Sequence, residues 1–109
     1  MADVLKNNPE AVADLKKNGT VQLNAVIADS FVDQLNNEVG RQIATNNPGL
    51  TMKQIAIKAL EAVRDGKSYV YEVGKNGKLA TIKHSSMTQK QFAKALKSLN
   101  DQFKPNEKN

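Results

Sequence analysis

The sequence predicts a mainly helical fold with a short β component, and three observations lead to this expectation. Thr51 and Thr88 each begin a Thr-x-x-Gln segment, which is the signature of a helix capping box. Residues 20–27 alternate between polar and apolar side chains, as a half-buried strand does. Two further alternating segments flank Asn76-Gly77, which is the strongest short signal for a β-hairpin.

Length and composition exclude several classes of protein. A chain of 109 residues is one domain's worth, with a modest core or a core completed by dimerisation. Cysteine is absent and His84 is the one histidine, so we expect no disulfide, metal or cofactor site. No apolar run reaches the roughly 20 residues of a membrane helix, and the first residues do not resemble a signal peptide. The expected location is therefore the cytoplasm, in association with the nucleoid.

The formal charge of +5 is concentrated in the second half of the chain. Residues 67–109 contain nine lysines and three acids, whereas residues 1–66 carry a balance of −1. A basic segment suits a polyanionic partner such as nucleic acid, because phosphate contacts supply most sequence-independent affinity. The alternative is that the scattered lysines only maintain solubility.

Residues 1–19 are predicted to form a short leading helix. Pro9 suits the first helical position and Gly19 suits the end, while Val12 and Leu15 form a narrow apolar stripe. Because this stripe is weak, we expect a loosely packed accessory arm.

The alternating segment that follows is the first informative feature for function. Val21, Leu23, Ala25 and Ile27 fall on one predicted face, and Thr20, Gln22, Asn24 and Val26 fall on the other. The amides of Gln22 and Asn24 offer paired donor and acceptor groups that can read the edge of an adenine. The alternative is an ordinary polar face. Since one strand cannot satisfy its own backbone groups, we expect it to pair with the same strand of a second chain.

Two amphipathic helices are predicted after this strand. Asp29 or Ser30 is expected to cap the first, whose apolar stripe contains Phe31, Leu35, Val39 and Ile43. The second begins at Thr51, and its apolar face contains Met52, Ile55, Ala56, Ala59, Leu60 and Val63. The first-turn amides of this second helix, with Lys53 beside them, form a natural seat for a phosphate.

A strand with outward polar residues, a capped helix, a Gly-Leu-Thr connection and a second helix resemble the ribbon-helix-helix (Arc/Mnt/MetJ-like) DNA-binding family over about residues 20–63. In that family the strands of two subunits pair and enter the major groove, while the second helix anchors a phosphate. The resemblance implies a homodimer bound to double-stranded DNA. It implies base contacts by Gln22, Asn24 and Val26, and phosphate contacts by Thr20, Leu50, Thr51, Met52 and Lys53.

The remaining chain is expected to add a basic β-hairpin and a helix. With Asn76-Gly77 as the turn, Tyr71 faces Ile82 and Val73 faces Ala80. The last helix starts at Thr88 and presents an apolar stripe formed by Phe92, Leu96, Leu99 and Phe103. Lys75, Lys78 and Lys83 are candidates for further phosphate contacts. The predicted segments are an arm at 1–19, a ribbon-helix-helix homodimer core at 20–65, an extension at 66–104 and a disordered tail at 105–109.

The favoured function is a sequence-specific DNA-binding homodimer, acting as a transcriptional repressor or as an accessory DNA protein of a phage, plasmid or mobile element. The alternative is a protein-interaction module, antitoxin-like or a phage-encoded inhibitor, that binds another protein through residues 67–104. An enzyme is disfavoured. Its only candidate acid-base residues, Tyr69, Tyr71, Glu72 and His84, are more typical of packing or of a solvated strand end.

Overall fold

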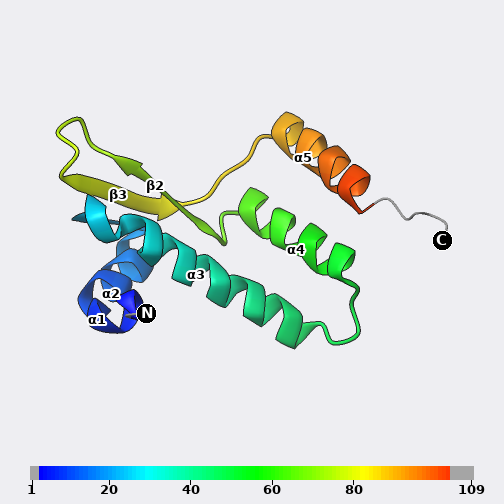
Figure 1. Cartoon of the computed structure of the whole chain (residues 1–109), viewed down its shortest axis with the longest axis horizontal. Helices are drawn as coiled ribbons and strands as arrows, with labels where there is room; N and C mark the ends of the chain where they lie inside the picture. The colour runs from blue at the N-terminus through cyan, green and yellow to red at the C-terminus, as the bar shows by residue number, and fades with distance from the viewer. Residues whose placement is uncertain (1–2, 104–109) are drawn as a thin grey trace.

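The computed structural model describes residues 3–103 and confirms a mainly helical chain with a short β component. The strands form one antiparallel sheet in the order β1-β3-β2. Figure 1 shows this sheet and the N-terminal helices at one end of the molecule, with α4 and α5 at the other end and the long helix α3 connecting them. The tail expected at residues 105–109 lies outside the described residues.

Two short helices, α1 (Val4–Asn7) and α2 (Pro9–Asn18), precede the sheet. α2 ends at Gly19, whose φ of 79° lies in the left-handed region that glycine adopts without strain. Leu15 of α2 is fully buried and joins the same apolar cluster as side chains from β1 and β3. The expectation of a loosely packed arm is therefore wrong, because Leu15 anchors α2 in the main core and Ala11 and Val12 pack against it.

The hairpin of β2 (Tyr69–Val73) and β3 (Leu79–His84) has the predicted register. Tyr71 lies opposite Ile82 and Val73 lies opposite Ala80, as expected. At the tip, the amide N–H of Gly77 donates to the carbonyl oxygen of Gly74 at 3.0 Å, and Gly77 has a φ of 72°. The turn therefore runs from Gly74 to Gly77, and the expected two-residue turn at Asn76-Gly77 is wrong, because Asn76 does not have the positive φ that such a turn requires.

β1 (Thr20–Asn24) pairs with β3 of its own chain, with Leu23 opposite Ala80. The prediction that β1 needs a second chain as its partner is wrong, because β3 supplies the missing backbone hydrogen bonds. The predicted boundary between residues 20–65 and 66–104 is also not a boundary between two units, since the sheet contains strands from both segments.

The long helix α3 (Ala25–Asn46) begins earlier than the sequence suggested. Asn24 caps it, because its side-chain Oδ1 accepts a hydrogen bond from the amide of Val26 at 2.9 Å. The expected cap at Asp29 or Ser30 is wrong, since both residues lie inside the helix. Val26 consequently belongs to the first turn of α3, where it is 86% exposed, and not to the strand.

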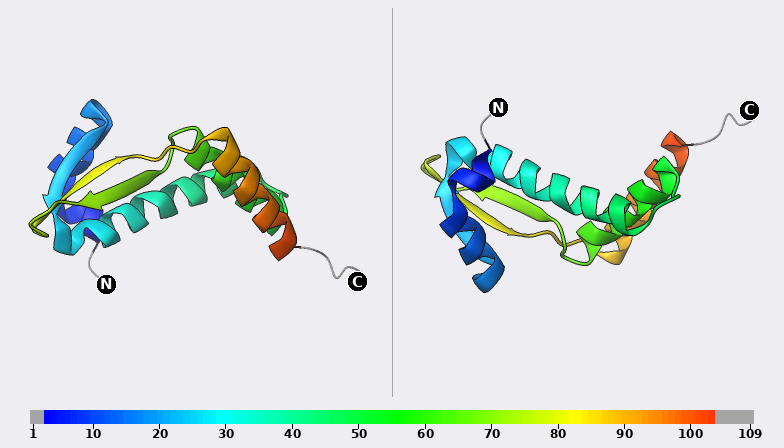
Figure 2. Two further views of the ribbon diagram at one scale, coloured as in Figure 1. Left: turned by 90° about the horizontal axis from the view of Figure 1, so that it is seen from above. Right: turned by 90° about the horizontal axis from the view of Figure 1, so that it is seen from below.

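The main core lies between the first half of α3 and one face of the sheet, and the two views of Figure 2 show α3 along that face. Its buried side chains are Leu15, Leu23, Ala28, Phe31, Val32, Leu35, Ala80 and Ile82. Asn36 of α3 also holds the edge strand β2, because its amide donates to the carbonyl oxygen of Tyr69 at 3.0 Å and accepts from the amide of Tyr69 at 2.8 Å. These contacts fix the sheet on α3 and leave its other face to solvent.

The far end of the molecule consists of α4 (Met52–Arg64) and α5 (Gln89–Gln102), which pack on each other. Both predicted capping boxes are present, with Thr51 paired to Gln54 and Thr88 paired to Gln91. The guanidinium carbon of Arg64 lies 4.5 Å from the centre of the Phe92 ring, a cation–π contact between the two helices.

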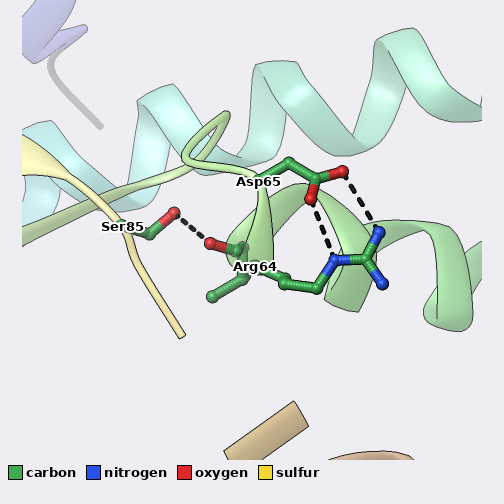
Figure 3. Close-up of polar contacts among 4 residues, drawn as sticks. Arg64, Asp65 and Ser85 are labelled. Atoms are coloured by element: carbon green, nitrogen blue, oxygen red, sulfur yellow. Dashed lines mark hydrogen bonds and ion pairs between the residues drawn. The ribbon is translucent and has the colours of Figure 1, made fainter. Parts of the chain in front are cut away.

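A buried serine joins the sheet to α4, as Figure 3 shows. The hydroxyl of Ser85, which is 4% exposed, donates to the carbonyl oxygen of Val63 at 3.0 Å, and its amide donates to the carbonyl oxygen of Ser68 at 2.9 Å. Beside it, Arg64 Nε and Asp65 Oδ1 are 2.9 Å apart, and this hydrogen bond lowers the pKa of Asp65. The residue that follows β3 is therefore tied to the last turn of α4 by the Ser85 hydroxyl and to the start of β2 by the Ser85 amide.

Among residues 3–103, no helix is both long and apolar enough to cross a membrane.

Candidate nucleic-acid interface

The sheet face that points away from α3 is the candidate site, and we call it the open sheet face. Along β1, Thr20, Gln22 and Asn24 are exposed, whereas Leu23 between them is buried. The open sheet face consists of Thr20, Gln22 and Asn24 from β1, Leu79, Thr81 and Lys83 from β3, and Val70 and Glu72 from β2. The prediction that Gln22 and Asn24 point away from the core is confirmed.

The strand register arranges these side chains in rows across the sheet. Gln22 lies opposite Thr81, which lies opposite Glu72 on its other side. The adjacent row contains Thr20, Lys83 and Val70. Because neighbouring strands are about 4.8 Å apart, the three strands span about 10 Å from β1 to β2. The face is therefore narrow, mainly polar and closely spaced.

Lys83 and Glu72 form an ion pair on this face. Lys83 Nζ lies 2.5 Å from Glu72 Oε1 and donates a hydrogen bond to it. This hydrogen bond, with the lysine charge, lowers the pKa of Glu72 below the ordinary value of 4.5. The ammonium group of Lys83 is thus shared with a carboxylate of the neighbouring row, and the two side chains together add no net charge to the open sheet face.

Two of the predicted contact residues on β1 already have structural partners. The hydroxyl of Thr20 donates to the carbonyl oxygen of Ile82 at 2.9 Å across the sheet. Asn24 is occupied in capping α3, so its acceptor oxygen is not free to read a base. Gln22 differs from both, because within residues 3–103 its side chain makes no hydrogen bond to the protein. The structure thus leaves one free amide on β1.

The predicted phosphate seat lies at the other end of α3. Leu50, Thr51, Met52 and Lys53 follow the C-terminal end of that helix. A helix of 22 residues is about 33 Å long, so this seat is not brought together with Gln22 within one chain. Thr51 is engaged in its capping box, and Met52 is 75% exposed.

The other predicted phosphate contacts lie on or beside the open sheet face. Lys75 and Lys78 are exposed in the loop that connects β2 to β3, and Lys83 lies on β3 itself. Sequence reasoning missed Thr81, which becomes a neighbour of Gln22 only through the pairing of β1 with β3. The alternating pattern of residues from Leu79 to Lys83 was the available signal that Thr81 lies on the same face as Lys83.

Of the acid-base candidates, Glu72 lies on the open sheet face, whereas Tyr69, Tyr71 and His84 lie on the opposite side or at the end of the sheet. Tyr71 Oη donates to Asp29 Oδ1 at 3.3 Å, and the Asp29 charge raises the tyrosine pKa above its ordinary value of 10.0. The rings of Tyr69 and His84 lie 4.8 Å apart between centroids. Among the described residues, no group of three or more His, Cys, Asp or Glu side chains is placed to hold a metal ion.

No protein-family model, curated protein or solved structure matches the chain. Its function is therefore inferred from the surfaces described above.

Proposed function

We propose that the protein binds double-stranded DNA by inserting the open sheet face into the major groove. One observation carries the proposal: a mainly polar, uncovered sheet face of about 10 Å width, backed by a closed core. The major groove of B-form DNA is about 12 Å wide and admits a two-stranded β-ribbon whose side chains reach the base edges. The neighbouring strands β1 and β3, which carry Gln22 and Thr81, form such a pair, and the core behind them supports precise placement.

Gln22 is the proposed base-reading residue. It is exposed, lies midway along the edge strand β1 and, within residues 3–103, has no protein hydrogen-bond partner to break before it binds. A glutamine amide pairs with the N6 and N7 positions of adenine, and a good bidentate pair contributes about 1–3 kcal/mol of discrimination. The hydroxyl of Thr81, beside it, adds a second donor and acceptor on the central strand.

The exposed lysines of the hairpin loop, Lys75 and Lys78, are the proposed phosphate contacts. They continue the sheet beyond its polar rows and therefore reach the groove edge when the strands occupy the groove. Phosphate contacts release condensed counterions, so affinity falls with salt by about 0.9 logarithmic unit per contact. Specific binding by Gln22 together with these contacts would make the protein a transcriptional repressor or an accessory DNA-binding protein.

Selection of DNA sites from a random duplex library, followed by fluorescence anisotropy, tests the proposal. Gln22→Ala should reduce the preference for the selected site over random DNA by about 5- to 150-fold while leaving affinity for random DNA unchanged. Lys75→Ala and Lys78→Ala should weaken binding to both DNAs and lower the salt slope by about one each. Lys17→Ala, an exposed lysine of α2, is the matched control. Absence of DNA binding at low salt, or loss of binding equal to that of Lys75→Ala in the control, would contradict the proposal.

A protein-interaction module is the second candidate, favoured by the observation that α5 has no fully buried side chain. Deleting residues 67–109 would not distinguish the two functions, because this removes two of the three strands. Point variants of the open sheet face and of α5, assayed separately for DNA binding and for protein binding, distinguish them without disrupting the sheet.

A further inference from the structure

The strand β2 is an outer strand of the sheet, so one of its two backbone edges does not face β3. The amide of Gly74 donates to the carbonyl oxygen of Leu79 at 2.8 Å, which shows that Gly74 points its backbone groups toward β3. In an antiparallel ladder, successive residues of a strand point their N–H and C=O groups alternately toward and away from the neighbouring strand. Three residues of β2 therefore point theirs away from β3, namely Tyr69, Tyr71 and Val73.

Asn36 of α3 occupies the first position of this edge. Its side-chain amide donates to the carbonyl oxygen of Tyr69 at 3.0 Å and accepts from the amide of Tyr69 at 2.8 Å. A residue of a fourth antiparallel strand would form the same pair of hydrogen bonds with Tyr69. Within residues 3–103, the outward backbone groups of Tyr71 and Val73 have no such partner. The β2 edge is thus closed at one end by a side chain that imitates a strand and is open over the next two positions.

The sequence of β2 lacks the residues that usually prevent an edge strand from pairing. Natural proteins place proline or lysine on a free edge, because unpaired backbone groups accept another strand. The strand YVYEV contains neither residue, and Val70 and Val73 are 40% and 51% exposed. An extended peptide is therefore the kind of partner that the β2 edge fits, and main-chain hydrogen bonds would hold it.

Carboxylates beside the open positions specify the charge of that peptide. Asp29, Asp33 and Asn36 follow one another at spacings of four and three residues, so they lie on the same side of α3. Asp29 accepts a hydrogen bond from Tyr71 Oη at 3.3 Å and Asn36 bonds to the backbone of β2, so this side of α3 runs beside the β2 edge. Both aspartates are exposed, and neither forms an ion pair with another described residue. A basic side chain of the peptide would supply the cation.

We propose that the β2 edge binds an extended basic peptide of another protein as a fourth, antiparallel strand. The peptide residue opposite Tyr71 points to the α3 side of the sheet, as Tyr71 does, so a lysine or arginine there lies beside Asp29 and Asp33. The residue two positions earlier in the peptide lies opposite Val73 and is apolar, and Asn36 ends the added strand beyond Tyr71. This inference goes beyond DNA binding and does not depend on it, because β2 lies outside the proposed β1–β3 ribbon.

NMR titration of the full chain with the acetylated and amidated peptide Ser-Val-Thr-Arg-Ser tests the proposal. Its valine is designed to lie opposite Val73 and its arginine opposite Tyr71. The backbone amides of Tyr71 and Val73 should shift and should exchange their hydrogens more slowly, because each gains an acceptor. The amide of Gln22 on the other outer strand, β1, should not change. Shifts confined to β1, or no shift on β2 at millimolar peptide, would overturn the proposal.

Methylation of the peptide backbone separates strand pairing from simple attraction between charges. A methyl group on the amide nitrogen of the arginine or of the valine removes a hydrogen bond to β2 and obstructs its edge, so it should weaken binding about tenfold. The same methyl group on the central threonine should leave binding nearly unchanged, because that N–H points away from β2. Equal effects of methylation at the arginine and at the threonine would contradict pairing as a strand.

Charge variants test the preference for a basic peptide. Asp33→Asn should weaken binding about 1.5- to 5-fold, which is typical of losing one exposed charge pair. Glu38→Gln removes an exposed carboxylate from the far side of α3 and should have no effect. Equal weakening by the two variants would refute the role of Asp33. Slower exchange at Tyr71 and Val73 as protein concentration rises without peptide would assign the edge to a second copy and overturn the proposal. DNA is absent from these samples, so failure here is distinct from failure of DNA binding.

Discussion

The two ends of the molecule contain similar apolar side chains, yet they differ in how completely these side chains are enclosed. At the sheet end, Leu15, Phe31 and Ile82 are fully buried between α2, α3 and the strands. At the other end, Phe92, Leu96 and Leu99 stay half-buried although α5 begins with a complete capping box. Local helix signals therefore specify where a helix starts and do not specify whether its apolar face is covered.

The difference in burial follows from the shape of the surface against which the helices of each end pack. A three-stranded sheet offers α3 a broad surface, and α2 closes one side of it, so a side chain such as Phe31 is surrounded in all directions. At the other end α4 packs on α5 and on α3, yet Ala62 is its one buried residue and α5 has none, so both helices leave part of their apolar stripe uncovered. The sheet end is thus a finished core and the helical end is one half of a core.

The largest expected effect comes from the same substitution made at both ends. Leu15→Ala removes a fully buried side chain and should lower the free energy of unfolding by about 2–5 kcal/mol. Leu96→Ala removes a half-buried side chain and should cost about 1 kcal/mol, because less apolar surface returns to water. Urea denaturation at low protein concentration measures both. If Leu15→Ala is too unstable to purify, Ile82→Val should cost about 0.5–1.5 kcal/mol. Equal losses for the two leucine variants would refute the distinction between a finished and an open core.

Hydrogen exchange provides the next largest contrast. Backbone amides of β3, the central strand, should exchange only through global unfolding. Amides of α5 should exchange at least about tenfold faster through local opening, because no side chain of this helix is fully buried. Exchange of α5 at the rate of β3 in dilute solution would show that the helical end is already closed.

The sequence was sufficient for elements whose signals are local. The capping boxes at Thr51 and Thr88 and the hairpin register around Asn76-Gly77 are all present as predicted. The partner of β1 is a non-local property, and there the sequence analysis was wrong. A lone strand and a hairpin within one chain each have an unpaired edge, and pairing them avoids the entropy cost of association with a second molecule. Thr81 could not be recognised as a neighbour of Gln22 before that pairing was known.

The start of α3 illustrates a second limit of prediction from the sequence. Residues 20–27 alternate throughout, but a helical stripe at Ala28, Phe31 and Leu35 begins immediately after them, and both patterns fit the boundary. Asn24 decides between them, because an asparagine side chain that caps a helix ends the strand at that residue. Asn24 was expected to contact bases, and the same amide chemistry that suggested this role is used here for capping.

A substitution at Asn24 separates the structural and DNA-binding interpretations. Asn24→Ala should destabilise the protein by about 1 kcal/mol, and Asn24→Ser should largely restore stability because serine is an equally good N-cap. Neither variant should change the preference for a selected DNA site at temperatures where both are folded. Urea denaturation and fluorescence anisotropy give the two readouts. A loss of site preference in Asn24→Ser with normal stability would return Asn24 to the set of base-reading residues.

The smallest expected effect concerns the two ion pairs, one at each end of the molecule. Arg64 and Asp65 are neighbours in sequence, so their contact needs little tertiary structure, whereas Lys83 and Glu72 meet only when the hairpin is formed. The pKa of Glu72 is lowered in the folded state, so the pair stabilises the sheet above the unfolded pKa of about 4.5 and loses that contribution as the pH falls through the folded value. Both side chains are substantially exposed, so the change in stability is small and the pKa itself is the better observable.

Carboxyl-detected NMR titration measures this pKa directly. Glu72 should titrate below its ordinary range in the wild type and return to that range in Lys83→Gln, while Lys78→Gln, which removes a nearby lysine outside the pair, should leave it low. In urea that unfolds the sheet, the lowered pKa of Glu72 should disappear, whereas Asp65 should retain part of its shift because Arg64 is adjacent in the chain. An unchanged Glu72 pKa in Lys83→Gln would mean that the charge of Lys83 is not held by this carboxylate. Lys83 would then be free to contact phosphate from the open sheet face, which would strengthen the case for DNA binding there.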